Sequence, residues 1–190
     1  MDLYLMDLLL KGAISTGKIL DVGFGTGRNL IHFLQRNPFA VYGIDTDQSC
    51  VSLMQMMITG FRDQDPTRFQ LSSVTEMTYP EKYFQTVLCA QVFHFLNDAE
   101  KVNAWERIYK VLVPGGLLYL SANSMVNFEN RSEPRPDQKH TFPDGTSGYF
   151  LSEKRLTQMV TDPRFEKVEP VRNIQYDDQH AETIMVLRKK

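Results

Sequence analysis

A glycine-rich turn near the start of the chain constrains the fold more than any other feature. Residues 18–23 form a short apolar run typical of a buried strand, and Gly23, Gly25 and Gly27 follow at alternate positions. Glycine permits a tight turn and lets the backbone approach a ligand closely. Because the pattern becomes helical from residue 28 to residue 35, we predict a strand–turn–helix unit whose first helical N–H groups face that ligand.

The rest of the chain repeats this alternation of strand and helix. The predicted strands cover residues 18–23, 40–45, 68–72, 84–90, 117–121, 165–174 and 183–188. The predicted helices cover residues 3–16, 28–35, 48–58, 98–112 and 152–160. This order predicts an α/β fold: a Rossmann-like, doubly wound sheet of about seven strands, mostly parallel, with an antiparallel strand near the C-terminus. We expect one domain over residues 1–190, with a long polar loop at 123–148.

Composition argues against several classes of partner. Lysine and arginine (21) nearly balance aspartate and glutamate (23), whereas binding to duplex nucleic acid calls for a basic face. We expect a cytoplasmic protein without a membrane partner, because the chain has neither a signal-peptide pattern nor an apolar run of about 18 residues. The four histidines lack the spacing of metal ligands, so no metal is expected. The sequence leaves the oligomeric state open.

An acidic residue at the end of the second predicted strand narrows the choice of ligand. Asp45 lies eighteen residues beyond Gly27, where a carboxylate can accept hydrogen bonds from both hydroxyls of a ribose. A dinucleotide-binding turn requires a small residue at the position of Arg28, so a nicotinamide oxidoreductase is disfavoured. A nucleoside-containing ligand other than a dinucleotide is therefore predicted.

At this point the chain resembles the class I S-adenosylmethionine-dependent methyltransferases. The three glycines match the glycine loop of that family, Asp21 the acid that precedes it, and Asp45 the ribose-binding acid. Residues 84–95 match the segment at the fourth strand, where the family often has a histidine such as His94, and residues 113–117 match the turn before the fifth strand. Within the family, the chain is most similar to small uncharacterised and tellurite-resistance-like enzymes that methylate small molecules.

The resemblance implies a set of residues that bind S-adenosylmethionine. These residues are Asp21, Gly23, Phe24, Gly25, Gly27, Asp45, Thr46, Ser73, Val74 and Ala90. The family often holds the adenine amino group with an acid after the third strand. This chain departs from that pattern, and backbone groups of Ser73 and Val74 take its place in the prediction.

The expected reaction is a direct S_N2 transfer of the methyl group to a small-molecule acceptor, for which proximity and orientation matter most. No catalytic residue is assigned, although His94 is a candidate either for lining the acceptor pocket or for packing behind it. In the 123–148 loop and its exit, His140, Phe142 and Tyr149 are candidates for acceptor contacts. The loop itself is either a lid or an insertion without a role. A non-catalytic module that binds or senses adenosylmethionine is the alternative function.

Overall fold

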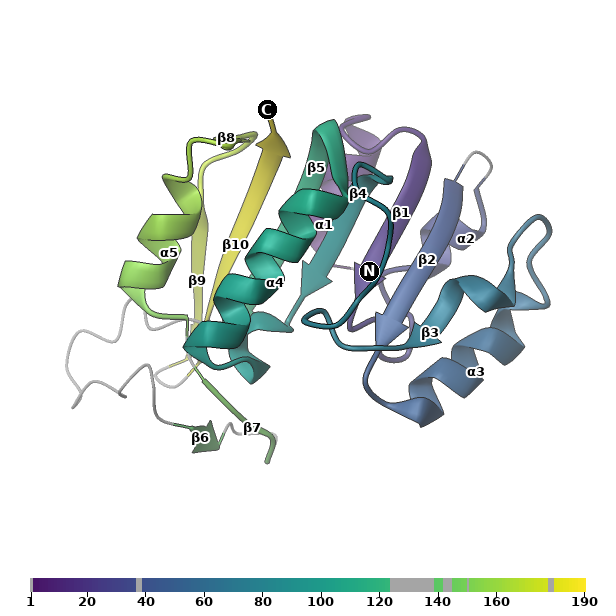
Figure 1. Cartoon of the computed structure of the whole chain (residues 1–190), viewed down its shortest axis with the longest axis horizontal. Coiled ribbons are helices and arrows are strands. Elements are labelled where there is room, and N and C mark those ends of the chain that lie inside the picture. Colours follow the sequence, from purple (N-terminus) through teal and green to yellow (C-terminus); the bar gives the residue numbers. More distant parts are fainter. Residues whose placement is uncertain (1, 37–38, 124–138, 142–144, 150, 178–179) are drawn as a thin grey trace.

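A central sheet between two layers of helices forms the architecture of the chain in the computed structural model (Figure 1). The structure describes residues 2–36, 39–123, 139–141, 145–149, 151–177 and 180–190. The strands of the main sheet are β1 (Gly17–Val22), β2 (Phe39–Asp45), β3 (Phe69–Leu71), β4 (Phe84–Ala90), β5 (Leu112–Asn123), β8 (Phe165–Lys167), β9 (Arg172–Asp177) and β10 (His180–Lys189). A separate two-stranded ladder consists of β6 (His140–Thr141) and β7 (Ser147–Gly148).

One helix precedes β1, and the others lie in the connections between strands. They are α1 (Leu3–Leu10), α2 (Ile31–Leu34), α3 (Gln48–Ile58), α4 (Asp98–Val111) and α5 (Glu153–Val160), together with the short 3-10 helices η1 (Pro66–Arg68) and η2 (Phe93–Phe95). A capping box begins α4: the Asn97 side chain accepts a hydrogen bond from the Glu100 N–H, and the Glu100 carboxylate accepts one from the Asn97 N–H.

The order of the strands confirms the predicted fold class. The main sheet runs β3-β2-β1-β4-β5-β10-β8, with β9 also paired to β10. Strands β1 to β5 are mutually parallel, and β10 is antiparallel to β5, β8 and β9. The main sheet has eight strands in the described residues, one more than predicted, because the predicted strand at 165–174 is divided into β8 and β9. Pro170, which has no N–H to donate to a ladder, lies in this break.

Two predicted helices are shorter than expected. The helix predicted at 3–16 ends at Leu10, and Gly12 follows in the left-handed region at φ +74°. The helix predicted at 28–35 is reduced to the four residues of α2, because the Leu30 N–H donates to the carbonyl of Gly27 in a tight turn instead. That the first N–H groups of this unit face a ligand stays a prediction.

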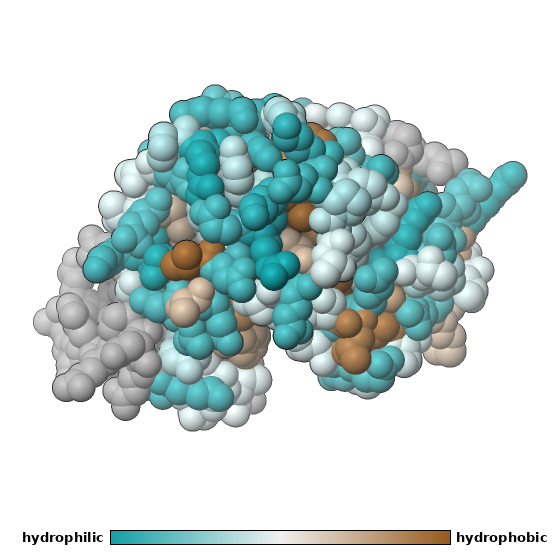
Figure 2. Space-filling view, viewed as in Figure 1, coloured by the Kyte–Doolittle hydropathy of each residue, from teal (hydrophilic) through white to brown (hydrophobic). Residues whose placement is uncertain are grey.

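Polar side chains cover most of the face shown in Figure 2. The large apolar side chains that are exposed are few in the described residues and include Met56 and Leu53 of α3. No described helix combines the length and the apolar character needed to cross a membrane.

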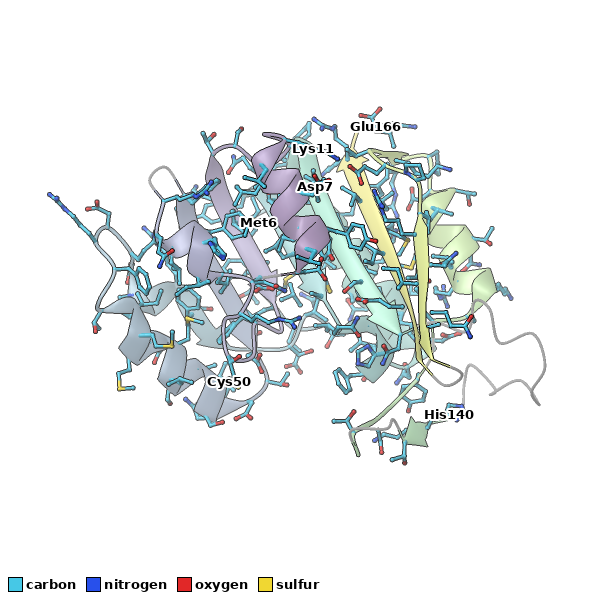
Figure 3. All side chains as sticks on the ribbon, turned by 180° about the vertical axis from the view of Figure 1, so that it is seen from behind. Met6, Asp7, Lys11, Cys50, His140 and Glu166 are labelled. Atoms are coloured by element: carbon cyan, nitrogen blue, oxygen red, sulfur yellow. The ribbon has the colours of Figure 1, made fainter. Side chains whose placement is uncertain are left out.

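The helices pack on the two faces of the sheet and bury a separate apolar cluster on each. Helices α1, α2 and α3 cover one face, on which Leu5, Phe33 and Met54 are buried. Figure 3 views the molecule from behind, with this face and α1 toward the viewer; it labels Met6 and Asp7 of α1 and Lys11 at its C-cap. Helices α4 and α5 cover the other face, where Ile108 and Met159 are buried.

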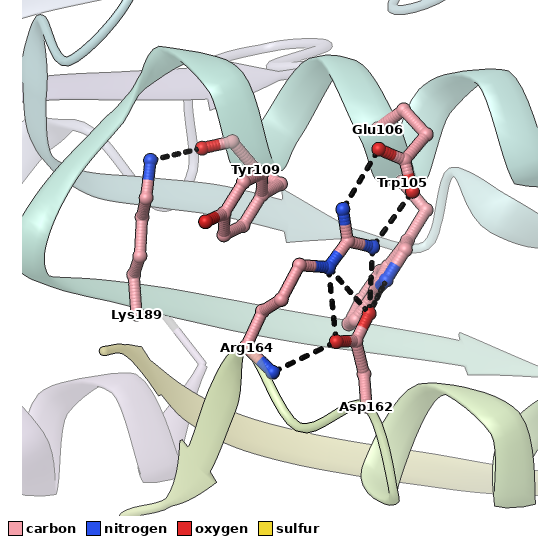
Figure 4. Close-up of polar contacts among 6 residues, drawn as sticks. All are labelled: Trp105, Glu106, Tyr109, Asp162, Arg164 and Lys189. Atoms are coloured by element: carbon pink, nitrogen blue, oxygen red, sulfur yellow. Dashed lines mark hydrogen bonds and ion pairs between the residues drawn. The ribbon is translucent and has the colours of Figure 1, made fainter.

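An ion-pair network fastens α4 to the segment before β8 (Figure 4). The Arg164 guanidinium donates to both carboxylate oxygens of Glu106, at 2.8 and 2.7 Å, and also to Asp162. Trp105 Nε1 donates to the same Asp162 carboxylate at 2.9 Å. We call Trp105, Glu106, Asp162 and Arg164 the C-terminal latch. The latch holds together the half of the sheet that lies away from the glycine turn.

Candidate functional site

The carboxyl ends of the parallel strands share one edge of the sheet, the lower edge in Figure 1. The described residues form a pocket of about 310 Å³ there, at the end of β1 where the glycine turn begins. Its lining consists of Val22, Gly23, Gly25, Asp45, Thr46, Ser72, Ser73, Val74, Gln91, Val92, Phe95 and Leu96. Ligands of open parallel sheets bind at this edge.

Six of the residues predicted to bind a cofactor line this pocket. They come from three separate stretches of the chain: Gly23, Gly25, Asp45, Thr46, Ser73 and Val74. The parallel pairing of β1 with β2 and of β2 with β3 brings these stretches together, since each stretch follows a strand that ends at the same edge.

The glycine turn uses left-handed backbone conformations that favour glycine. The φ angles of Gly23, Gly25 and Gly27 are +68°, +53° and +78°. A Cβ on Gly23 would lie 2.5 Å from Cγ2 of Val92, whereas a Cβ on Gly25 would meet nothing within 4 Å. Gly25 lines the pocket, and the position that a side chain would take there is open. A ligand can therefore approach the backbone closely at Gly25.

Asp45 connects the glycine turn to the end of β2. Its carboxylate accepts hydrogen bonds from the N–H of Gly25 at 2.7 Å and from the N–H of Asp47 at 2.9 Å. An ionised carboxylate offers about four acceptor positions, so these two bonds leave capacity for hydroxyls of a ligand. Asp45 thus both orders the turn and presents acceptor oxygens to the pocket.

Asp21 lies just before the turn and is almost completely buried, at 1% exposure. Neither carboxylate oxygen has a hydrogen-bond partner among the described residues. Burial, followed by repulsion from Asp45, raises the pKa of Asp21 to about 8. A buried polar group without a partner is costly, and such groups often mark the place of a bound ligand or ion. A cationic ligand group nearby would favour the ionised form of Asp21 and pair with it.

Four predicted cofactor residues do not line the pocket: Asp21, described above, and three others. Phe24 is buried and packs edge-to-face on Phe69, with the ring centroids 5.6 Å apart. Gly27 lies against Met54, which a Cβ at this position would strike. Ala90 is the last residue of β4 and is half-buried. These positions support the walls of the turn and the sheet edge.

The candidate acceptor residues are not part of the pocket lining, and one of them lies outside the described residues. His94 is buried at 4% exposure within η2, between the pocket residues Val92 and Phe95, and its carbonyl accepts a hydrogen bond from the N–H of Tyr149. His140 lies on the β6–β7 ladder (Figure 3). Phe142 and most of the 123–148 loop lie outside the described residues.

Sequence reasoning did not identify half of the lining residues. These are Val22, Ser72, Gln91, Val92, Phe95 and Leu96. Gln91 is the most informative of them, because it is a non-glycine residue in the left-handed region, at φ +60°. No local sequence pattern signals that conformation. The apolar residues of η2, in contrast, belong to the 84–95 segment that the family resemblance had already singled out.

The chain matches known methyltransferases in sequence. A family profile described as "Methyltransferase domain" matches residues 19–116. The chain is 31% identical over 109 residues to the demethylmenaquinone methyltransferase of Deinococcus radiodurans, covering 57% of this chain and 44% of that protein. It is 26% identical over 117 residues to the carboxy-S-adenosyl-L-methionine synthase of Aliivibrio fischeri, covering 60% of this chain and 48% of that protein. The chain spans about half the length of these curated relatives.

Solved structures share the fold over nearly the whole chain. The cyclase SpnF has a TM-score of 0.75 at 18% identity, covering 98% of this chain and 80% of that protein. The 1,6-didemethyltoxoflavin-N1-methyltransferase of Burkholderia thailandensis, solved with S-adenosylhomocysteine, has a TM-score of 0.73 at 17% identity, covering 98% of this chain and 77% of that protein. These neighbours establish the fold alone. The family match over more than half of the sequence shows that the chain belongs to the methyltransferase-domain family.

Proposed function

We propose that the chain catalyses methyl transfer from S-adenosylmethionine to a small-molecule acceptor, with the cofactor in the pocket beside the glycine turn. The proposal depends on one observation: an open glycine turn lies beside two aspartates, one that presents oxygens to the pocket and one that is buried. Gly25 leaves the pocket open, Asp45 presents acceptor oxygens, and Asp21 is buried with no hydrogen-bond partner among the described residues. These features fit a ligand that combines ribose hydroxyls with positive charge.

Each of these residues has a distinct role in the proposal. Asp45 accepts hydrogen bonds from the ribose hydroxyls while it keeps the turn ordered through the Gly25 N–H. Ser73 and Val74 line the adenine end of the pocket. Asp21 lies beneath the methionine end, close to the turn, where a cationic ligand group lowers its pKa and favours the ionised form.

When bound, S-adenosylmethionine supplies a methyl group on a sulfonium, which an acceptor atom takes by direct S_N2 displacement. The residues of the chain therefore have mainly to orient the reactants and exclude water. Val92, Phe95 and Leu96 form an apolar wall suited to excluding water. His94, buried next to that wall, remains the candidate for contact with the acceptor or for support behind it.

The size of the pocket and the charge of the chain favour a small acceptor over a nucleic acid. A pocket of about 310 Å³ lies at the lower end of the range for small-ligand sites, which is roughly 300–1,000 Å³. The balanced charge offers no excess of basic residues for phosphate backbones.

Calorimetric titration and an acceptor panel test the proposal together. We expect S-adenosylmethionine and S-adenosylhomocysteine to bind and NAD not to bind. Turnover of any member of a panel of small nitrogen, oxygen and sulfur nucleophiles then establishes the enzyme. Binding without turnover over a broad panel would favour the alternative, a module that senses adenosylmethionine. Failure of both cofactor forms to bind would refute the assignment of the pocket.

The loop at 123–148 is proposed as a lid over the acceptor. The described residues that leave it contact the site, since the Tyr149 N–H donates to the carbonyl of His94. Limited proteolysis between residues 123 and 148 should slow when S-adenosylhomocysteine and an acceptor are both bound. Unchanged turnover after the loop is shortened would place the acceptor pocket elsewhere.

A further inference from the structure

A polar cluster lies at the same edge of the sheet, next to the proposed cofactor pocket. It consists of Gln91, Tyr119, Ser121 and Glu182, which we call the acceptor-side cluster. Gln91 belongs to both places: it lines the pocket, while its side-chain amide donates to the Glu182 carboxylate and lies 3.4 Å from Ser121 Oγ. The cluster is thus joined to the pocket by a single side chain.

Glu182 reaches this edge because β10 runs antiparallel to its neighbour. The first residues of β10 lie where β5 ends, and Glu182 pairs with Asn123, the last residue of β5. Glu182 is only 7% exposed, although glutamate is among the residue types least often buried in proteins. A buried carboxylate at the end of a strand that borders a ligand pocket calls for a functional explanation.

The backbone of Gln91 is strained in a way that serves this contact. Its φ of +60° costs a non-glycine residue about 1–2 kcal/mol relative to an ordinary conformation. In this conformation its N–H donates to the carbonyl of Ser121 at 2.8 Å, and its side chain extends toward β5 and β10. Strain of this kind is characteristic of ligand-binding sites.

The strand order determines which side of the pocket the cluster occupies. Asp45, Ser73 and Val74 follow β2 and β3, whereas Gln91 follows β4, on the other side of β1. If the nucleoside occupies the β2–β3 end, its transferable group points toward β4. The next strands in the sheet, β5 and β10, then border the space from which an acceptor approaches.

The cluster and the pocket carry negative charge. Asp45 is the charged side chain in the described lining, which includes neither lysine nor arginine. Burial, followed by the nearby Asp2 and Glu182 carboxylates, raises the pKa of Tyr119 far above its usual range, so its hydroxyl stays protonated and uncharged. Glu182 is the acidic side chain of the cluster, and a carboxylate can only accept hydrogen bonds.

We propose that Glu182, oriented by Gln91, forms an anionic wall on the acceptor side of the pocket and selects amines over carboxylates and phosphates. This inference depends on the proposed function, because it takes the pocket to hold S-adenosylmethionine. A carboxylate here stabilises positive charge and N–H donors on an incoming amine and repels anions.

Two cofactor analogues test the wall without knowledge of the natural acceptor. In sinefungin a carbon that bears an amino group replaces the methyl-sulfonium. Sinefungin therefore places an ammonium group where the methyl group of the cofactor would lie, whereas S-adenosylhomocysteine has an uncharged sulfur and no methyl group. We expect wild-type protein to bind sinefungin at least as tightly as S-adenosylhomocysteine. In Glu182→Gln, which keeps the shape and a hydrogen bond to Gln91, sinefungin should weaken about tenfold relative to S-adenosylhomocysteine.

Glu166→Gln is the matched control. Glu166 is exposed on β8 at the opposite end of the sheet, where it pairs with Arg188 (Figure 3). This variant should leave both affinities unchanged. If Glu182→Gln weakens both analogues equally, or neither, the anionic wall is refuted while the cofactor site stands. If Glu182→Gln does not fold, the wild-type protein alone tests the proposal. Binding of S-adenosylhomocysteine to wild type more than tenfold more tightly than sinefungin would also refute the wall. If wild type binds neither analogue, the proposed function fails and the inference with it.

Discussion

Two aspartates in this molecule have opposite environments. Asp162 in the C-terminal latch accepts hydrogen bonds from Arg164 and Trp105, and these contacts, Arg164 first, lower its pKa to about 2. Asp21 at the glycine turn is more deeply buried and has no hydrogen-bond partner in the described residues, and burial raises its pKa to about 8. The charged groups of the latch have partners within the chain, whereas no described residue supplies a hydrogen-bond partner for Asp21.

This difference separates residues that stabilise the fold from residues that await a ligand. In the latch, every charged group contributes to holding α4 against the C-terminal strands. At the turn, left-handed glycines and an unpartnered acid cost stability, and such costs are common at functional sites.

Gly25→Val should abolish binding of S-adenosylmethionine. Valine strongly disfavours φ +53°, and its side chain would fill the open space beside the turn. Titration calorimetry should show a loss of more than about a hundredfold in affinity, equivalent to about 2.7 kcal/mol. The matched control is Gly12→Val, which has the same kind of strain at φ +74° and open surroundings but lies away from the pocket. It should bind normally, and equal losses in both variants would mean that strain alone is responsible.

Asp45→Ala should weaken S-adenosylmethionine by about tenfold or more, because charge-assisted hydrogen bonds contribute about 1.5–3 kcal/mol. The Gly25 N–H also loses its acceptor. Asp65→Ala serves as control, since Asp65 similarly accepts from backbone and hydroxyl groups of Thr67 but lies outside the pocket lining. Unchanged affinity in a folded Asp45 variant would contradict its proposed role.

Asp162→Asn should lower the melting temperature at pH 7. The folded pKa lies below the value of about 3.8 for an unfolded aspartate, so the stabilisation is present above pH 4 and lost as the pH falls through 2. A loss of roughly 1–2 kcal/mol corresponds to about 2–8 °C in a protein of this size. Melting curves from pH 7 to pH 2 should converge. A constant difference would show that the charge of Asp162 is not the cause.

Asp21→Asn should have an effect of the opposite sign. The folded pKa is raised, so the native state retains a proton that the unfolded state loses above about pH 4, and stability falls as the pH rises toward 8. At pH 8.5 the variant should melt above wild type, because it carries no buried charge at this position. Below pH 4 the difference should vanish. A lower melting temperature at pH 8.5 would indicate a stabilising partner for Asp21.

Much of the fold followed from local pattern, because buried strands, helices and the glycine turn each have local sequence signals. The glycines and Asp45 could be assigned to one site, since the ends of adjacent parallel strands must meet. Gln91 and Glu182 could not, because their contact joins residues 91 positions apart through an antiparallel pairing and a strained backbone. The short length of α2 could not be predicted either, because the turn at Gly27 competes with the apolar helical pattern that follows it.

A crystal structure of the complex with S-adenosylhomocysteine would show whether the pocket beside the glycine turn holds the cofactor. We expect the ribose hydroxyls within hydrogen-bond distance of the Asp45 carboxylate, the ligand in contact with the backbone at Gly25, and its amino acid end nearest Asp21. Density for the ligand at another place, or an empty pocket at a concentration that saturates binding in solution, would refute this assignment of the pocket.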